Sequence, residues 1–329
     1  MKNIIFICNS LGDEGLGHFT RCFNIASGVR KLNKDISIYF DGEYCNFALS
    51  KIINSKFKLL DYKKRNLSYS KSIVIFDSYK HNQEKIDYIG NKSFHSIKID
   101  DFNRYNLSKI DSVINFRVDA EYEIYNTKNK FIGLKYYPSE LELLKIREQN
   151  IYNFKNNTNK ISNKILIFIG GNDSYNIGEK IIKEIDKFLY GKTFIWATRL
   201  VGKNKLNIRN NKLLVHNLQL NISNLLKDID LVICGGGLVK YESSFTLIPC
   251  LSISQNKDQE IDSQICHKNG IIYNLGLHSD LFQNTKLIKS KINKFLNEEF
   301  QYKFKKNLLN KYDTNSIFRL SEKILEFLS

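Results

Sequence analysis

The chain has 329 residues, about twice the length of a common domain, so two domains of ordinary size are expected. Hydrophobic residues make up 42% and charged residues 26% of the sequence, a balance that argues against a disordered or fibrous protein. The net charge of +16 favours anionic partners, but the lysines are scattered and form no arginine-rich stripe with interleaved aromatic residues, which argues against nucleic-acid binding.

The six cysteines show no C-x-x-C spacing, and several lie inside apolar runs, as buried free thiols do in a reducing compartment. No basic and apolar leader precedes the first predicted strand, and no apolar run reaches the roughly 18 residues that span a bilayer. We therefore expect a cytoplasmic protein without membrane insertion, whose positive charge is compatible with peripheral contact to a membrane surface. The sequence does not indicate an oligomeric state.

The first half of the chain alternates short β-branched runs with segments of helical period, which is typical of βαβ units and parallel sheets. Each predicted strand is a continuous apolar run, as expected where helices cover both faces of a sheet. Strands are predicted at residues 3–8, 36–42, 72–79, 95–101 and 112–116, and helices at 18–33 and 44–54.

A polar segment at 152–164 predicts a linker, and a second cycle of strands and helices follows it. Strands are predicted at 164–173, 193–199, 212–217, 231–237 and 249–254, and helices at 176–190, 222–230, 238–247 and 315–329. The pattern predicts an α/β fold with two doubly wound, Rossmann-like domains. We assign residues 1–157 to the first domain, 158–310 to the second, and 311–329 to a helix that packs across the junction.

The loop after the first strand carries Gly12, Gly15 and Gly17 and leads into His18. In open parallel sheets ligands bind beyond the carboxyl ends of the strands, and glycines there let the backbone approach an anionic group. The spacing matches neither the G-x-G-x-x-G fingerprint nor a P-loop. At the first turn of a helix, His18 is either a general base held neutral by the helix dipole or a residue that only caps the loop.

A second glycine cluster, CGGGLVKYE, combines a strand, a glycine turn and a helix start that carries Glu242. This order suits a diphosphate on the turn and a carboxylate on ribose hydroxyls, although glycines also serve close packing of a helix against a strand. The chain then returns Asp258 and Gln259 to the same edge of the predicted sheet.

Polar residues follow three further strands: Asp77 and Tyr79, the pair Asp100 and Asp101, and the segment Gly171, Asn172 and Asp173. The aspartate pair has no histidine or third carboxylate at ligand spacing, and the other histidines are dispersed, so no metal site is predicted. Asp173 either hydrogen bonds across a cleft or caps the helix that begins near Asn176.

The segments GLGHFTRCFNIA, FDSY, IDD, GLKYYPSELELL, IFIGGND and CGGGLVKYESSFTLIPCLSISQNKDQ occur in this order. Together they resemble the nucleotide-sugar hydrolases of pseudaminic acid biosynthesis, the PseG/SpsG group, which is itself similar to the MurG-type glycosyltransferase that makes lipid II. The resemblance extends to about Gly276 and returns at YDTNSIFRL. The chain departs from the group at Gly235–Gly237, at Asp258, where asparagine is usual, and near 137–140, where an expected arginine is absent.

The resemblance implies a GT-B arrangement of two Rossmann-like domains that face a central cleft, with the nucleotide held mainly by the C-terminal domain. It implies that His18 activates the nucleophile and that Tyr79 lies near the sugar, either as a catalytic residue or as an aromatic lid. The substrate-binding candidates are Gly15, Gly17, Arg21, Asp77, Gly171, Asn172, Asp173, Gly236, Gly237, Leu238, Glu242, Asp258 and Gln259.

These observations predict a hydrolase that cleaves a UDP-linked deoxy-acetamido sugar to UDP and free sugar, with no cofactor and no metal. One alternative is a GT-B glycosyltransferase that modifies a surface glycan, lipid or protein from a nucleotide-activated sugar. A further alternative is a subunit that binds a nucleotide sugar without turning it over.

Overall fold

The computed structural model describes residues 3–11, 16–61, 68–156, 163–171, 173–198, 206–217 and 221–328. The chain divides into two compact units, Met1–Leu141 with Asp313–Ser329, and Glu142–Tyr312, which we call the first and second units. The first division falls after Leu141, the first residue of helix α4 (Leu141–Lys155), whereas the sequence prediction placed it after residue 157. The closing segment belongs to the first unit, whereas the sequence prediction assigned it to the junction.

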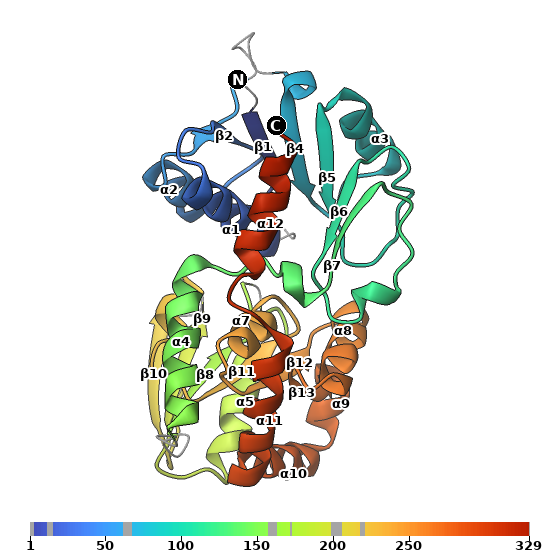
Figure 1. Cartoon of the computed structure of the whole chain (residues 1–329). Coiled ribbons are helices and arrows are strands. Elements are labelled where there is room, and N and C mark those ends of the chain that lie inside the picture. The colour runs from blue at the N-terminus through green and yellow to red at the C-terminus, as the bar shows by residue number, and fades with distance from the viewer. Residues whose placement is uncertain are drawn as a thin grey trace. The chain divides into compact units, whose positions relative to one another are not determined.

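The described part of the first unit forms a parallel sheet in the order β3-β2-β1-β4-β5-β6-β7 (Figure 1). Its strands are β1 (Asn3–Cys8), β2 (Ile38–Asp41), β3 (Lys58–Leu59), β4 (Ser72–Asp77), β5 (His95–Ile99), β6 (Ser112–Asn115) and β7 (Asn129–Ile132). Its helices are α1 (Gly17–Leu32), α2 (Asn46–Asn54), α3 (Gln83–Lys92) and α12 (Ser316–Glu326).

Strand order reverses between β1 and β4, which lie side by side in the sheet with Cys8 opposite Asp77. Strands β2 and β3 extend the sheet on one side of this point, and β5 to β7 extend it on the other. Doubly wound sheets generally bind their ligands at the carboxyl ends of the strands beside such a reversal point, which here are β1 and β4. The loops that follow these two strands carry the residues of interest.

Helix α12 lies along α1, although the two are separated by almost the whole chain (Figure 1). Gly28 allows this close approach, because a Cβ atom there would lie 2.4 Å from Ser321 Oγ and 2.9 Å from Ile317. On its buried face, α12 contributes Leu320 and Ile324 to the apolar core that also contains α1 and β1. The helix that carries His18 is thus supported by the end of the chain.

The described part of the second unit forms a parallel sheet in the order β10-β9-β8-β11-β12-β13 (Figure 1). Its strands are β8 (Lys164–Phe168), β9 (Thr193–Thr198), β10 (Lys212–Asn217), β11 (Leu231–Gly235), β12 (Cys250–Ser254) and β13 (Tyr273–Leu277). After α4, its helices are α5 (Ile177–Asp186), α6 (Ile222–Leu226), α7 (Val239–Phe245), α8 (Lys257–Lys268), α9 (His278–Gln283), α10 (Thr285–Leu296) and α11 (Glu298–Lys311). Here the order reverses between β8 and β11.

The predicted strands and helices are confirmed: strands 3–8 and 212–217 have the predicted ends, and the other elements differ from the prediction by a few residues at one or both ends. The predicted linker at 152–164 is wrong in its first part, since residues 152–155 form the last turn of α4, while 157–162 lie outside the described residues. Arg147 holds α4 in place, donating from Nη1 to the Phe245 carbonyl over 2.5 Å and from Nη2 to the Tyr312 carbonyl over 2.6 Å. Within the described ranges, no helix is long and apolar enough to cross a membrane.

Candidate active site

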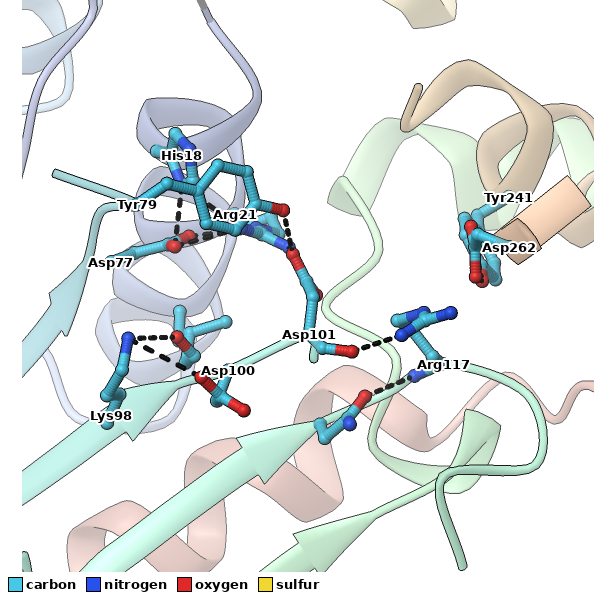
Figure 2. Close-up of polar contacts among 12 residues, drawn as sticks. His18, Arg21, Asp77, Tyr79, Lys98, Asp100, Asp101, Arg117, Tyr241 and Asp262 are labelled. Atoms are coloured by element: carbon cyan, nitrogen blue, oxygen red, sulfur yellow. Dashed lines mark hydrogen bonds and ion pairs between the residues drawn. The ribbon is translucent and has the colours of Figure 1, made fainter. Parts of the chain in front are cut away.

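His18 lies in the first turn of α1 and contacts the last residue of β4. Its Nδ1 atom lies 2.6 Å from Asp77 Oδ1, and both side chains are almost fully buried (Figure 2). The contact arises because β1 leads into α1 while β4 ends beside β1, at the point where strand order reverses. A side chain that reaches a carboxylate on the neighbouring strand can be oriented by it to act as a general base.

The partner of Nδ1 decides which tautomer the imidazole adopts. The Asp77 carboxylate can only accept, so we assign the proton to His18 Nδ1, which donates to Asp77. The neutral ring then has its lone pair on Nε2, where a proton can be taken from a substrate. Arg21 Nη2 lies 3.0 Å from the same Nδ1 atom, but both are donors, and Nη2 donates instead to Asp77 Oδ1 over 2.8 Å.

Arg21, one turn along α1 from His18, joins two buried carboxylates. Its Nε donates to Asp77 Oδ2 over 2.8 Å, and its Nη1 donates to both Asp101 oxygens over 2.8 and 2.7 Å. Burial by itself would raise the pKa of Asp77, but the charge of Arg21 and the interaction with His18 outweigh it and lower that pKa below its ordinary value. Arg21 was predicted from the sequence as a substrate-binding residue, and in the structure each of its guanidinium nitrogens donates to a carboxylate.

Asp101 accepts a short hydrogen bond from the Tyr79 hydroxyl, so this ring is tied to the same network (Figure 2). The Tyr79 ring stands edge-on to the His18 imidazole with centroids 4.5 Å apart, and 52% of the residue is exposed. Burial of the hydroxyl end, followed by the nearby Asp101 charge, raises the pKa of Tyr79. For Asp101 itself, burial acts to raise the pKa, but Arg21 and the Tyr79 hydrogen bond lower it below the ordinary range.

Arg117 completes the network from the loop after β6. It donates from Nη1 to the Asp101 backbone carbonyl (Figure 2), and its own N–H donates to Asn115 Oδ1 over 3.0 Å. Neither Asp101 nor Arg117 was among the predicted site residues. Their signal in the sequence was their position, since each is the second residue after the end of a strand on the β4 side of the reversal point.

Asp100, the other member of the aspartate pair, serves its own loop. It accepts from the Asn103 N–H over 2.6 Å and from the Tyr125 hydroxyl over 3.0 Å, and Lys98 Nζ lies 3.7 Å away. Among the residues that the structure describes, no three His, Cys, Asp or Glu side chains gather where they could hold a metal ion.

In the glycine turn of the second unit, the first two glycines are closely packed and the third is open. A Cβ atom on Gly235 would lie 2.0 Å from the Ile169 carbonyl oxygen, and one on Gly236 would lie 2.6 Å from Gln259 Cβ. Gly237 is exposed, and a Cβ atom there would meet nothing within 4 Å. The backbone at Gly237 can therefore be approached by a ligand.

The other predicted residues of this unit lie around the same edge of its sheet. Leu238 is half-buried before α7, and Glu242 lies within α7 with 3% exposed. Gln259 accepts from the Gln255 N–H through Oε1 over 2.9 Å, and Asp258 is exposed in the first turn of α8.

Asp173 caps helix α5, the second of the two alternatives that the sequence left open. Its Oδ1 accepts from the Ile177 N–H over 2.7 Å and its Oδ2 from the Gly178 N–H over 2.8 Å. Gly171 is half-buried after β8, and Gly17 is the first residue of α1. Gly15 and Asn172 lie outside the described residues.

Beneath the glycine turn, α7 carries a fully buried ammonium group. Lys240 Nζ donates to the Gly236 carbonyl over 2.7 Å and lies 2.5 Å from Asp262 Oδ2 on α8. Tyr241 donates to the same carboxylate over 3.2 Å (Figure 2). Burial acts to lower the pKa of Lys240, but the Asp262 charge raises it, so the amine stays protonated.

No family model matches the chain. The uncharacterized protein MJ1062 of Methanocaldococcus jannaschii is 26% identical to it over 276 residues, which are 78% of this chain and 56% of that protein. The chain thus spans about half the length of the curated relative it matches.

Solved structures match the chain over almost its whole length. MurG of Acinetobacter baumannii has a TM-score of 0.68 at 9% identity, covering 99% of both chains. The glycotransferase of kitacinnamycin has a TM-score of 0.67 at 10% identity, covering 99% of this chain and 98% of that one. The UDP-GlcNAc 2-epimerase of Neisseria meningitidis, solved with UDP-GlcNAc, has a TM-score of 0.59 at 13% identity, covering 100% and 99%. With its two parallel-sheet α/β units, the chain therefore has the GT-B fold of MurG and these related enzymes.

Proposed function

We propose that the protein is a nucleotide-sugar hydrolase, which cleaves a UDP-linked deoxy-acetamido sugar to UDP and the free sugar in a pathway of the pseudaminic acid type. The observation that carries the proposal is the 2.6 Å contact between His18 Nδ1 and Asp77 Oδ1 at the reversal point of the first sheet. A base oriented by a carboxylate is suited to activate a hydroxyl or water nucleophile. The choice of UDP is supported by the UDP-GlcNAc bound to a structure of the same fold.

In the proposed reaction a water molecule attacks the anomeric carbon of the sugar. Its proton passes to His18 Nε2, while Asp77 accepts from Nδ1 and stabilises the imidazolium that forms. The new bond joins the water oxygen to the anomeric carbon, and the bond from that carbon to the phosphate oxygen breaks. The electron pair of the broken bond leaves with the UDP diphosphate.

The second unit would hold the nucleotide. We place the diphosphate at the exposed Gly237 and the backbone N–H groups beside it, which can stabilise the charge that grows as UDP leaves. Glu242 would take ribose hydroxyls, with Leu238, Asp258 and Gln259 at the border of the nucleotide site and Gly171 and Asp173 next to it. Gly17 and Tyr79 would border the sugar on the first unit.

A glycosyltransferase is the second candidate. The specific observation in its favour is that two of the similar structures are named as MurG and as a glycotransferase. The same base would then take a proton from an acceptor hydroxyl and not from water. For either activity we propose a cytoplasmic location, because all six cysteines are free, as in a reducing compartment.

The test is incubation of the purified protein with a panel of UDP-, GDP- and CMP-sugars without any acceptor, with free sugar and nucleotide followed by NMR. We expect rapid release from one UDP-acetamido sugar, and loss of that release in His18→Ala with UDP binding retained. His216→Ala, a histidine on β10 in the second unit, is the matched control and should keep the activity.

Binding of UDP without sugar release would contradict the hydrolase and favour the glycosyltransferase. Acceptor hydroxyls would then be tested. Failure of every nucleotide and nucleotide sugar to bind would contradict both candidates. Loss of UDP binding in His18→Ala would show that His18 stabilises the fold and does not act on the nucleophile.

A further inference from the structure

Asp101 is the one carboxylate of the described network that contacts both Arg21 and Tyr79. Arg21 Nη1 donates to its two oxygens over 2.8 and 2.7 Å, and the Tyr79 hydroxyl donates to Oδ2. Arg117 donates to its backbone carbonyl, so the carboxylate is fixed from the main chain as well as from its side chain. Asp101 is itself 6% exposed, which limits any exchange of these partners with water.

Arg21 links the fixed carboxylate of Asp101 to the pair of Asp77 and His18. The side of the guanidinium that does not face Asp101 makes two hydrogen bonds of 2.8 Å to Asp77, one to each oxygen. A guanidinium is planar and rigid, so fixing one edge on Asp101 fixes the orientation of the other edge. That second edge sets the plane of the Asp77 carboxylate, whose Oδ1 accepts the His18 Nδ1 proton.

We propose that Asp101 is a positioning residue for the reaction, which acts through Arg21 to keep Asp77 on His18 and holds Tyr79 as a wall beside the imidazole. This inference rests on the proposed function, since it assigns a role within the same site. It also separates two roles for Tyr79. The hydroxyl proton is committed to Asp101, so the ring contributes shape and exclusion of water, and not a proton.

Asp100 offers a matched comparison. It is the neighbouring residue, equally buried, and bound to Asn103 and Tyr125. Replacing either aspartate by asparagine removes one buried charge at the same edge of the sheet. If Asp101 only stabilised the fold, the two variants should lose turnover to the same extent. If Asp101 positions the base, Asp101→Asn should lose more turnover than Asp100→Asn.

The experiment compares Asp101→Asn with Asp100→Asn in sugar release without acceptor. We expect kcat to fall by about ten- to a hundredfold in Asp101→Asn, as for a small misplacement of a catalytic group, with KM changed by less than about threefold. Asp100→Asn should stay within about threefold of the wild-type kcat.

A second readout does not depend on turnover. The ¹⁵N shifts of the His18 ring should show the Nδ1-protonated tautomer in the wild type and in Asp100→Asn, and a mixture of tautomers in Asp101→Asn. If the wild type releases no sugar, the proposed function fails, and this readout still tests the positioning role. If Asp101→Asn does not fold, Asp101→Glu keeps the charge but displaces it, and should still lose turnover.

Two results would overturn the inference. The first is wild-type turnover and tautomer in a folded Asp101→Asn or Asp101→Glu. The second is an equal loss in Asp100→Asn, which would indicate a general effect of buried charge.

Discussion

Lys240 Nζ lies 2.5 Å from Asp262 Oδ2, and none of the lysine side chain is exposed. Removing one partner of a buried ion pair leaves the other charge uncompensated, which costs about 3 to 5 kcal/mol. We expect Lys240→Met to lower the free energy of unfolding of the second unit by about this amount. Urea unfolding followed by circular dichroism measures the change.

The control is Lys183→Met, which removes an exposed lysine 2.6 Å from Glu179 on the same helix face. Exposed pairs at this spacing contribute about 0.5 kcal/mol or less, so its unfolding midpoint should hardly move. Equal effects of the two substitutions would contradict the importance of the buried pair.

Asp77→Asn tests the assignment of the His18 tautomer. An amide can donate to Nδ1, which would place the imidazole proton on Nε2 and remove the basic lone pair from the reacting side. We expect kcat for sugar release to fall on the order of 10³- to 10⁴-fold with UDP binding unchanged. Stopped assays over a range of substrate concentrations separate kcat from KM.

Asp111→Asn is the control for this change, because the Asp111 carboxylate instead accepts from the Ser96 N–H and hydroxyl over 2.8 Å. Its turnover should stay close to wild type. A folded Asp77→Asn variant with full turnover would show that His18 needs no carboxylate partner.

The same carboxylates make stability depend on acid pH. Arg21 and its neighbours hold the pKa values of Asp77 and Asp101 below the ordinary value of about 3.9 for an unfolded chain. Such groups stabilise the fold fully above that value, and the contribution is lost as the pH falls from about 4 toward the lower folded pKa. The difference in unfolding free energy between wild type and Asp101→Asn should therefore shrink between pH 5 and pH 3, as measured by urea unfolding. A constant difference over that interval would contradict the charge-based account.

Substitution by alanine should have different effects on stability at two adjacent glycines of the turn, Gly236 and Gly237. In Gly236→Ala the new Cβ atom meets the Gln259 side chain at its root, so the turn or α8 must shift, at a cost of about 1 to 3 kcal/mol. We expect weaker UDP binding in this variant by titration calorimetry. Gly237→Ala enters open space and should change the unfolding free energy by less than about 0.5 kcal/mol. Tight UDP binding by Gly236→Ala would place the diphosphate elsewhere.

The parallel strands could be predicted because their continuous apolar runs reflect burial on both faces. Helix α4 could not, since its polar end resembles a linker and one of its buried positions is Arg147, which interrupts the apolar stripe. Its partners are carbonyl groups nearly a hundred or more residues away, and no local pattern reveals them.

The candidate site likewise contains some residues that the sequence indicates and others that it does not. His18, Asp77 and Tyr79 could be found from their positions at strand ends. Asp101 was interpreted only as half of an aspartate pair, because its role depends on Arg21, which reaches it from another element. The capping of α5 by Asp173 was one of two alternatives, and the choice required the positions of the Ile177 and Gly178 N–H groups.

The packing of α12 against α1 has a consequence for the order in which the two units are completed during synthesis. The second unit is continuous in sequence and can fold as soon as residue 312 has left the ribosome. The first unit begins earlier but lacks Leu320 and Ile324 of its core until these two residues have emerged as well. Helix α1, although it is made near the start of synthesis, therefore gains its full packing only after the whole second unit has been made.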